Sequence, residues 1–276
     1  MTWGTCREMN RAILYCLVAA AATVLLLQGC GTMENSRRWG EDATLKPGWS
    51  KIGESALNAV TSPMVIIPAA TALLLQLHDM DERISRWAVG HTPTTGSSDR
   101  AERLSSDLRT VSLVSFYLSV LATPSGDDPG GWCISKAKGL AVQGSAAALS
   151  NEITFALKDE VDRERPNGRD DESFPSGHAS NAAAFTVLAS RNVHDMAIPV
   201  SAKTGIDIVL HAVMLGVAWE RVEAGVHYPS DVLAGIAMAY GIGAFVSDSF
   251  MGVGTGIVPV AGPTDEGYYI GICRRF

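Results

Sequence analysis

The chain has 276 residues, of which 47% are hydrophobic, 18% charged and 7% aromatic. Disorder is excluded, because disordered chains are poor in apolar residues. The net charge of −7 argues against a general nucleic-acid binder, which needs a basic face. A mean hydropathy of +0.14 leaves open whether the apolar residues form membrane spans or a buried helical core.

The first 29 residues have the layout of a secretory signal. Arg7 and Arg11 precede an apolar run from Ala12 to Leu27, which is short for a transmembrane helix of roughly 20 residues. The run ends in Leu-Leu-Gln-Gly-Cys, which resembles a bacterial lipoprotein lipobox. The resemblance implies removal of residues 1–29, lipidation of Cys30, and a location on the periplasmic side of the cell envelope, with Gly31 directing the protein to the outer membrane. A plain signal peptide or an uncleaved anchor helix are the alternatives.

Two cysteines besides Cys30 remain after such processing, namely Cys133 and Cys273. An oxidising periplasm permits a disulfide between them. Two unpaired buried thiols fit the sequence equally well, so both alternatives stay open.

The mature chain divides into three parts by composition. Residues 30–50 are polar and indicate a tether that carries the lipidated cysteine. Residues 51–250 contain Ala-rich segments with apolar residues at three- and four-residue spacing, which predicts helices. These segments lie near residues 55–77, 101–121, 139–165, 178–190, 204–222 and 229–246. Residues 251–276 predict a short β-hairpin, because two apolar stretches flank a turn region rich in Gly and Pro.

The segment near residues 55–77 is the only uncharged one long enough to span a membrane, and Pro63 and Pro68 interrupt it. The other segments are shorter or contain charges such as Glu152 and Asp207. Such stretches are more often buried helices of a globular bundle. The sequence therefore favours a globular helical domain held at the membrane by its lipid anchor.

A first charged cluster ends the segment at residues 139–165. Lys158 and Arg165 are seven residues apart, which is about two helical turns, so a continuous helix would point both from one face. Pro166 would then end that helix. Taken alone, the cluster is more typical of a solvated helix end, because Lys and Arg are common near a helix C-terminus.

A second cluster, Pro175-Ser176-Gly177-His178, precedes an apolar helical segment. Pro175 suits the first turn of that helix, so the amides of the next three residues would be unpaired donors, where anions bind. His178 at this position could give or take a proton near pH 7.

A third cluster runs from Arg221 to Asp231. Gly225 is a natural helix stop, and Pro229 begins the next helix, which places Asp231 in the first turn behind His227. Asp231 could thus bond one ring nitrogen of His227 and leave the other free. An imidazole nucleophile or base needs such orientation.

The ordered trio Lys-x6-Arg-Pro, Pro-Ser-Gly-His and Arg-x5-His-x3-Asp resembles the type 2 phosphatidic acid phosphatase superfamily, which also includes class A acid phosphatases and vanadium haloperoxidases. The resemblance covers roughly residues 50–250 and implies an all-α helical bundle. Glu220 departs from it, because the family commonly has Ser before this arginine.

The resemblance also implies a metal-independent phosphatase that hydrolyses phosphate monoesters or lipid phosphates and diphosphates. In that scheme His227 attacks phosphorus and forms a phosphohistidine, Asp231 orients its ring, and His178 protonates the leaving group. The implied phosphate-binding residues are Lys158, Arg165, Ser176, Gly177 and Arg221. No cofactor and no nucleic acid is implied, and the expected partners are a phosphorylated small molecule or lipid and the membrane.

Other functions are compatible with parts of this pattern. A vanadate-dependent haloperoxidase would use the same phosphate-binding residues to hold vanadate. A non-catalytic surface lipoprotein could retain these residues for binding alone. A serine hydrolase using Ser176, His178 and Asp231 is disfavoured, because no Gly-x-Ser-x-Gly elbow is present. The acidic stretches at residues 79–82 and 170–172 could suggest a metal enzyme, but they are more typical of solvated loops.

Overall fold

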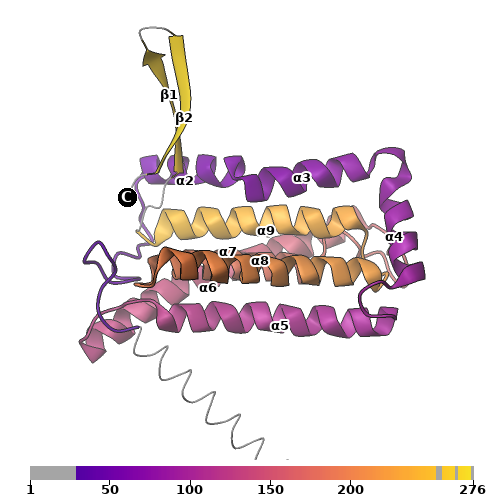
Figure 1. Cartoon of the computed structure of the whole chain (residues 1–276), viewed down its shortest axis with the longest axis horizontal. Helices are drawn as coiled ribbons and strands as arrows, with labels where there is room; N and C mark the ends of the chain where they lie inside the picture. The colour runs from indigo at the N-terminus through magenta and orange to yellow at the C-terminus, as the bar shows by residue number, and fades with distance from the viewer. Residues whose placement is uncertain (1–28, 253–256, 265–266, 275–276) are drawn as a thin grey trace, which may run out of the picture.

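The computed structural model describes residues 29–252, 257–264 and 267–274. The predicted signal at residues 1–29 therefore lies almost entirely outside the described residues. The described body is helical, as the sequence predicted (Figure 1). Its helices are α2 (Trp49–Thr61), α3 (Pro63–Leu75), a 3-10 turn η1 (Leu77–Asp79), α4 (Met80–His91), α5 (Ser98–Ala122), α6 (Pro129–Val161), α7 (Gly177–Asp195), α8 (Val200–Glu223) and α9 (Pro229–Phe250).

The apolar segment near residues 55–77 forms two helices instead of one. Ser62 breaks it, since its side chain accepts from the Met64 amide and Pro63 begins the second helix. The axes of α2 and α3 differ by 47° across this break. Pro68 is accommodated inside α3.

The centre of the bundle is α7, which packs against α5, α8 and α9. Its buried side chains include Ala179, Ala182 and Ala183, whose small size lets neighbouring helices approach closely. Gly235 lets the start of α9 lie closely against α7, since a Cβ there would lie 2.8 Å from the Ser180 Oγ and 3.0 Å from the Ser176 carbonyl oxygen. This contact fixes the first turns of α7 and α9 side by side.

Four helix ends meet at one end of the bundle: the C-termini of α6 and α8 and the N-termini of α7 and α9. In Figure 1, α4 runs across this end of the long helices. The connections at residues 162–176 and 224–228 lie between these helix ends. All three charged clusters of the sequence are therefore at the same end.

The helix that carries Lys158 differs from its predicted bounds. It begins at Pro129, where the Asp128 side chain caps it by accepting from the Gly131 amide at 2.6 Å. It ends at Val161, because Asp162 takes the left-handed conformation with φ of 46°. Arg165 is thus in a loop, and the prediction that one continuous helix carries it together with Lys158 is wrong.

The segment predicted to be a polar tether is packed against the bundle. Trp39 is fully buried, and its indole nitrogen donates to the Asn192 Oδ1 at 3.1 Å. Met33 is also buried, at 5% exposure. The burial of these apolar side chains outweighs the polar composition around them.

The chain ends in two strands, β1 (Ile257–Thr264) and β2 (Gly267–Arg274), which pair antiparallel with Ile257 opposite Arg274. The side chain of Cys273 lies outside the described residues. Cys133 is exposed and forms no disulfide within the described part of the chain. Whether these two cysteines pair stays untested, whereas the expectation of a buried thiol at Cys133 is wrong.

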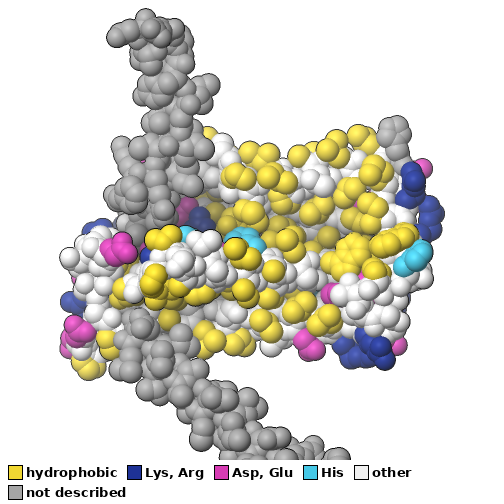
Figure 2. Space-filling view, in the orientation of Figure 1, with side chains coloured by type: hydrophobic (Ala, Val, Ile, Leu, Met, Phe, Trp, Pro, Cys, Tyr) yellow, Lys and Arg dark blue, Asp and Glu magenta, His cyan; other side chains and the backbone are white. Residues whose placement is uncertain are grey.

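The outer faces of several helices are apolar, in contrast to the expected globular domain. Exposed large apolar side chains include Ile67, Leu73, Leu74, Val111, Val114, Leu118, Ile208, Val209 and Leu215. Figure 2 shows apolar side chains across the middle of one face and charged side chains toward its ends. By length and composition, α8 and α9 could each cross a membrane, as could α2 and α3 if the bent pair is one span. These features suggest a membrane protein.

Candidate active site

His227 lies in the connection between α8 and α9 and is buried, at 2% exposure. Its Nδ1 is 2.6 Å from the backbone carbonyl oxygen of Ser173. Because a carbonyl oxygen only accepts, Nδ1 carries the proton, and Nε2 of the neutral ring keeps a free lone pair. Burial lowers the pKa of His227 well below its usual value, and the positive charges of Arg221, Lys158 and Arg165 lower it further. The ring is therefore a neutral imidazole at pH 7, which is the form that can act as a nucleophile.

The Asp231 carboxylate does not orient His227 directly, so that prediction is wrong. It accepts from the Ser173 hydroxyl at 2.5 Å, the Tyr228 amide at 2.8 Å and the Arg163 guanidinium at 2.5 Å. These three donors occupy the carboxylate, because Asp231 caps the first turn of α9 and faces Arg163. Its link to the histidine runs through Ser173, whose hydroxyl bonds Asp231 and whose carbonyl bonds His227.

Arg163 joins the loop before α7 to α4. Besides Asp231 it binds the Asp81 carboxylate at 2.9 Å, and Asp81 accepts from the Ser230 amide at 2.8 Å. Asp81 is 3% exposed, so its interpretation as part of a solvated acidic loop is wrong. Arg163 was not predicted as a site residue, although Arg163 lies inside the first motif, between Lys158 and Arg165.

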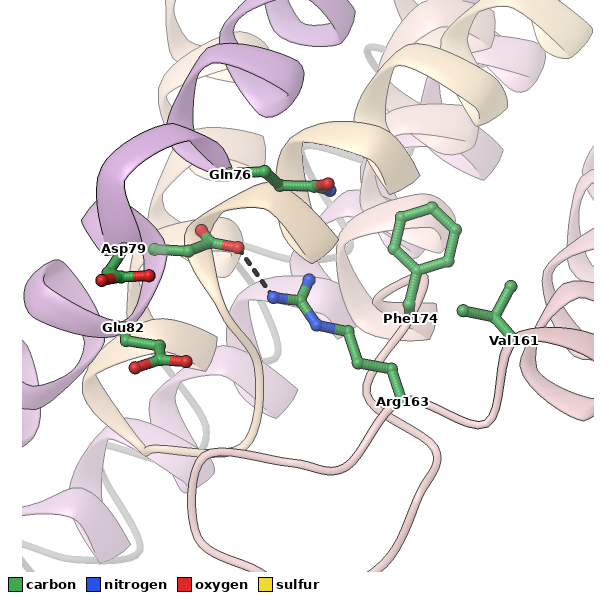
Figure 3. Close-up of a pocket in the computed structure, with 7 residues that line it drawn as sticks. Gln76, Asp79, Glu82, Val161, Arg163 and Phe174 are labelled. Atoms are coloured by element: carbon green, nitrogen blue, oxygen red, sulfur yellow. Dashed lines mark hydrogen bonds and ion pairs between the residues drawn. The ribbon is translucent and has the colours of Figure 1, made fainter.

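A pocket of about 410 Å³ opens beside this network (Figure 3). In Figure 3 the Arg163 side chain points toward the acidic residues of η1 and α4. The lining residues are Gln76, Asp79, Asp81, Glu82, Val161, Arg163 and Phe174. Within the described residues, no group of three or more His, Cys, Asp or Glu side chains is placed to hold a metal ion.

Lys158 and Arg165 come from different elements but act on each other electrostatically. The Lys158 ammonium donates to the Glu172 carbonyl oxygen, and the Arg165 Nε donates to the exposed Asp170 carboxylate at 2.5 Å. Burial lowers the pKa of Lys158, and the positive charge of Arg165 lowers it further. Lys158 also lies near the second motif, since a Cβ on Gly177 would be 4.0 Å from its Cε.

The second motif begins α7, but in a different register from the predicted one. Pro175 precedes the helix, and Ser176 is its N-cap, with its Oγ accepting from the Ala179 amide at 3.5 Å. The Ser176 amide donates to the Asp231 carbonyl oxygen at 3.1 Å, so the prediction that this amide is unpaired is wrong. Gly177 and His178 occupy the first turn, where helix amides lack an intrahelical acceptor.

Arg221 approaches from the last turn of α8 and is buried, at 5% exposure. Its Nη1 is 3.4 Å from the Ser105 hydroxyl of α5. Its Nε has no hydrogen-bond partner among the described residues. A buried guanidinium that is this poorly satisfied fits an anion-binding role. Glu220, which replaces the serine that the resemblance expects, is also buried.

His178 lies between α7 and α5, with its Nε2 3.3 Å from the Ser106 hydroxyl. Burial, together with the positive charges of Arg221, Arg109, Arg165 and Lys158, lowers the pKa of His178 to about 3. Ser105, Ser106 and Arg109 of α5 were missed by the sequence analysis. The one available signal was Arg109, a cation on an apolar helical segment.

Comparison with known proteins agrees with this geometry. Residues 139–253 match the model of the PAP2 superfamily, and this range contains all three motifs as well as Arg163 and Ser173. This segment is similar to the PAP2 domain. Helices α2 to α5, including Arg109, lie outside the matched range.

Two curated relatives of the PAP2 domain are decaprenylphosphoryl-5-phosphoribose phosphatases of Mycobacterium tuberculosis, from strains CDC 1551 / Oshkosh and ATCC 25618 / H37Rv. Each is 31% identical over 114 residues, which are 38% of this chain and 58% of the relative. The chain thus spans little more than half the length of these relatives.

A solved structure shares the fold. It is the transmembrane PAP2 type phosphatidylglycerolphosphate phosphatase from Bacillus subtilis, with a TM-score of 0.51 and 21% identity. The match covers 68% of this chain and 94% of that one. The resemblance in fold extends beyond the PAP2 domain to part of the N-terminal half.

Proposed function

We propose that this chain is a membrane-bound phosphatase that cleaves phosphate ester or diphosphate bonds through a phosphohistidine at His227. The observation that carries the proposal is a buried neutral imidazole surrounded by Lys158, Arg165 and Arg221, with the Arg221 Nε left without a partner. The names of the curated relatives, which are phosphatases, support the same reaction class.

In the first step, the three cations and the first-turn amides of α7 bind the non-bridging phosphoryl oxygens. His227 Nε2 attacks phosphorus, and the bond between phosphorus and the leaving oxygen breaks with its electron pair on that oxygen. Preorganised cations stabilise the charge on the equatorial oxygens without reorganising during the reaction, which is usually a large contribution. Nδ1 keeps its bond to the Ser173 carbonyl, which offsets the positive charge that develops on the ring.

His178 is the proposed general acid for the leaving oxygen. Its pKa of about 3 means that it is neutral in the unliganded site. A bound phosphate dianion offsets the cations that depress this pKa and therefore favours protonation of His178 on binding. In the second step, His178 takes a proton from the water that attacks the phosphohistidine, and inorganic phosphate and free His227 result.

A lipid phosphate is the proposed substrate class. The apolar outer faces of α3, α5 and α8 would place the site at the membrane surface, within reach of a lipid headgroup. We expect no metal requirement, because side-chain cations supply the positive charge. Turnover should survive a chelator, and loss with rescue by a divalent ion would contradict this scheme.

A substrate panel with purified full-length protein in detergent tests the proposal. It compares a small aryl phosphate, phosphatidic acid, phosphatidylglycerol phosphate and undecaprenyl diphosphate, with phosphate release as the readout. We expect release from at least one lipid, faster than from the aryl phosphate. Absence of release from every ester, with phosphate still bound, would instead indicate a non-catalytic phosphate-binding protein. Peroxide-dependent halogenation after vanadate loading would indicate a haloperoxidase.

The proposed lipid at Cys30 lies at the other end of the bundle from the site. The Gly29 carbonyl oxygen accepts from the Ser125 amide at 3.0 Å and from the Trp132 indole at 3.0 Å. Lys158 follows Trp132 by 26 residues in α6, which is roughly 39 Å along the helix. A lipidated Cys30 and a periplasmic site are therefore compatible only if the bundle lies on one side of the membrane.

Single-cysteine variants distinguish a bundle that lies on one side of the membrane from a bundle that spans it. Cys133, at the Cys30 end, and an introduced Arg103→Cys, near the site end, are labelled in intact cells with a membrane-impermeant maleimide. Labelling of both supports a periplasmic site on a lipid-anchored bundle. Labelling of only one shows that the bundle spans the membrane and that the site and Cys30 face opposite sides.

A further inference from the structure

Two neighbouring serines of α5 contact the site from outside the matched residues 139–253. The Ser106 hydroxyl oxygen lies 3.3 Å from the Nε2 of His178, and the Ser105 hydroxyl oxygen lies 3.4 Å from the Nη1 of Arg221. Ser105 is fully buried and Ser106 is half-buried. Helix α5 therefore contacts both the proposed general acid and a proposed phosphate-binding cation.

The direction of these hydrogen bonds follows from the single proton of a serine hydroxyl. Both hydroxyls donate to the backbone carbonyl oxygen of Glu102, at 2.8 Å from Ser105 and 3.2 Å from Ser106. A carbonyl oxygen only accepts, and a hydroxyl has one proton to give, so each serine oxygen is an acceptor toward the site. For Ser105 the same conclusion follows independently, because the guanidinium of Arg221 only donates.

The acceptor role of Ser106 assigns the proton of His178. Because the Ser106 oxygen accepts, the Nε2 of His178 carries a proton in the neutral ring. The bond to Ser106 is the one side-chain hydrogen bond of His178 within the described residues. Nδ1 therefore holds the lone pair of the neutral ring, and it is the nitrogen left to take up and release a proton.

The two histidines of the site are thus held through opposite nitrogens. The Nδ1–H of His227 donates to the Ser173 carbonyl oxygen and leaves Nε2 for the attack on phosphorus. The Nε2–H of His178 donates to Ser106 and leaves Nδ1 for the leaving oxygen. In both rings, the hydrogen bond at one nitrogen decides which nitrogen does the chemistry.

We propose that Ser106 is a positioning residue for the proposed general acid, because it holds His178 in the tautomer that presents Nδ1 to the leaving oxygen. The inference rests on the proposed phosphatase function and adds a residue of α5 to it. In the protonated ring both nitrogens carry a proton. The Nδ1–H bond breaks as its proton moves to the leaving oxygen, which carries the electron pair from its broken bond to phosphorus. The Nε2–H bond stays intact and directed at Ser106.

Two phosphate esters that differ by one methylene group test whether Ser106 acts on protonation of the leaving group. 4-Nitrophenyl phosphate releases a stabilised phenolate that leaves without a proton, whereas 4-nitrobenzyl phosphate releases an alkoxide that needs one. On full-length protein in detergent, Ser106→Ala should lower kcat/KM for the benzyl ester by about 10-fold, because the acid loses the bond that orients it. For the phenyl ester we expect a change of less than about 2-fold, since general-acid catalysis contributes little there.

Ser112→Ala is the matched control. The Ser112 hydroxyl, like that of Ser106, donates to the carbonyl oxygen four residues before it, but Ser112 makes no other side-chain hydrogen bond within the described residues. Ser112→Ala should change neither value, and Ser106→Thr, which keeps the hydroxyl, should restore most of the activity on the benzyl ester. An equal loss on both esters in Ser106→Ala, no loss on either, or a loss in Ser106→Thr as large as in Ser106→Ala would overturn the proposal.

The tautomer of His178 is measured without turnover. Nitrogen-15 NMR of full-length protein with labelled histidine, in detergent near neutral pH, distinguishes an Nε2–H ring from an Nδ1–H ring, and the His178 signal is identified by its absence from His178→Asn. We expect the Nε2–H tautomer in the wild type and a mixture in Ser106→Ala. An Nδ1–H tautomer in the wild type would overturn the proposal, also where neither nitro ester is a substrate. Failure of the wild type to hydrolyse any ester, lipids included, would instead overturn the proposed function.

Discussion

Charged side chains lie at both ends of α7, but they are arranged in opposite ways. At the C-terminal end, Arg191 forms two 2.8 Å bonds with the Asp248 carboxylate of α9, and His194 is 2.7 Å from Asp207. At the N-terminal end, Arg221 and Arg109 have no carboxylate partner within the described residues.

The paired charges at the C-terminal end stabilise the bundle, whereas the unpaired charges at the N-terminal end are available to bind a ligand. A carboxylate partner compensates the cost of removing an arginine from water. An arginine without such a partner lowers the stability of the folded protein until an anion binds to it. Protein sites that bind anions commonly accept such a cost in exchange for function. The predictions below test whether the two ends can be perturbed independently.

The largest effect is expected from the histidines. His227→Ala should lower kcat by more than about 10³-fold, because the nucleophile is lost, while phosphate or vanadate still binds through the cations. His194→Ala, at the opposite end, is the matched control and should keep nearly full activity. Phosphate release in steady state and vanadate binding by calorimetry measure both. Full activity of His227→Ala would end the phosphohistidine mechanism.

Substitution of Arg221 should lower activity without lowering stability. Arg221→Gln removes transition-state stabilisation and should lower kcat/KM by about 10²-fold, with thermal stability unchanged or increased because an unpaired buried charge is lost. Phosphate release and thermal unfolding in the same detergent are the two measurements. A strong loss of stability would show that Arg221 is part of the scaffold.

Asp248→Asn is the counterpart at the other end. It leaves the partly buried Arg191 without its counter-charge and should lower the free energy of unfolding by about 2 kcal/mol. The kcat of the folded protein should stay close to that of the wild type, since the site is at the far end of α7. A selective loss of kcat without loss of stability would contradict the separation of the two ends.

The pH dependence should follow the charges around His227. Its pKa lies well below the usual value, so the nucleophile stays neutral and kcat/KM should persist below pH 6. Arg165→Gln removes one of the positive charges that disfavour the imidazolium, so the pKa of His227 rises. The acid limb of the kcat/KM profile should therefore move to higher pH in this variant. An unchanged limb would show that Arg165 does not act on His227.

The smallest effect is expected at Ser173. Ser173→Ala removes the hydroxyl bond to Asp231 but keeps the backbone carbonyl that orients His227, so kcat should fall only about 5-fold. Asp231→Asn also disturbs Arg163 and the cap of α9 and should cost more. Steady-state kinetics of the two variants give the comparison. A larger loss in Ser173→Ala than in Asp231→Asn would contradict the carbonyl as the main orienting group.

Much of the site could be read from the sequence, because its motifs are local patterns with fixed chemistry. The spacing around Arg221, Gly225 and Pro229 correctly indicated a helix end, a turn and a new helix. Contacts between motifs were less predictable. The Asp231 carboxylate has several donors within reach, and only the folded chain shows that Ser173, Tyr228 and Arg163 occupy it instead of His227.

The sequence by itself determined the helical class of the body and the resemblance to a phosphatase superfamily, because periodicity and motif order are properties of the chain. The tertiary structure decided which faces of the helices remain apolar and exposed, and that Trp39 packs against the bundle. It also brought Ser106 of α5 to His178 of α7, across 72 residues of sequence. Such juxtapositions depend on how helices pack, and that is set by the whole set of side chains at their interfaces rather than by any local pattern.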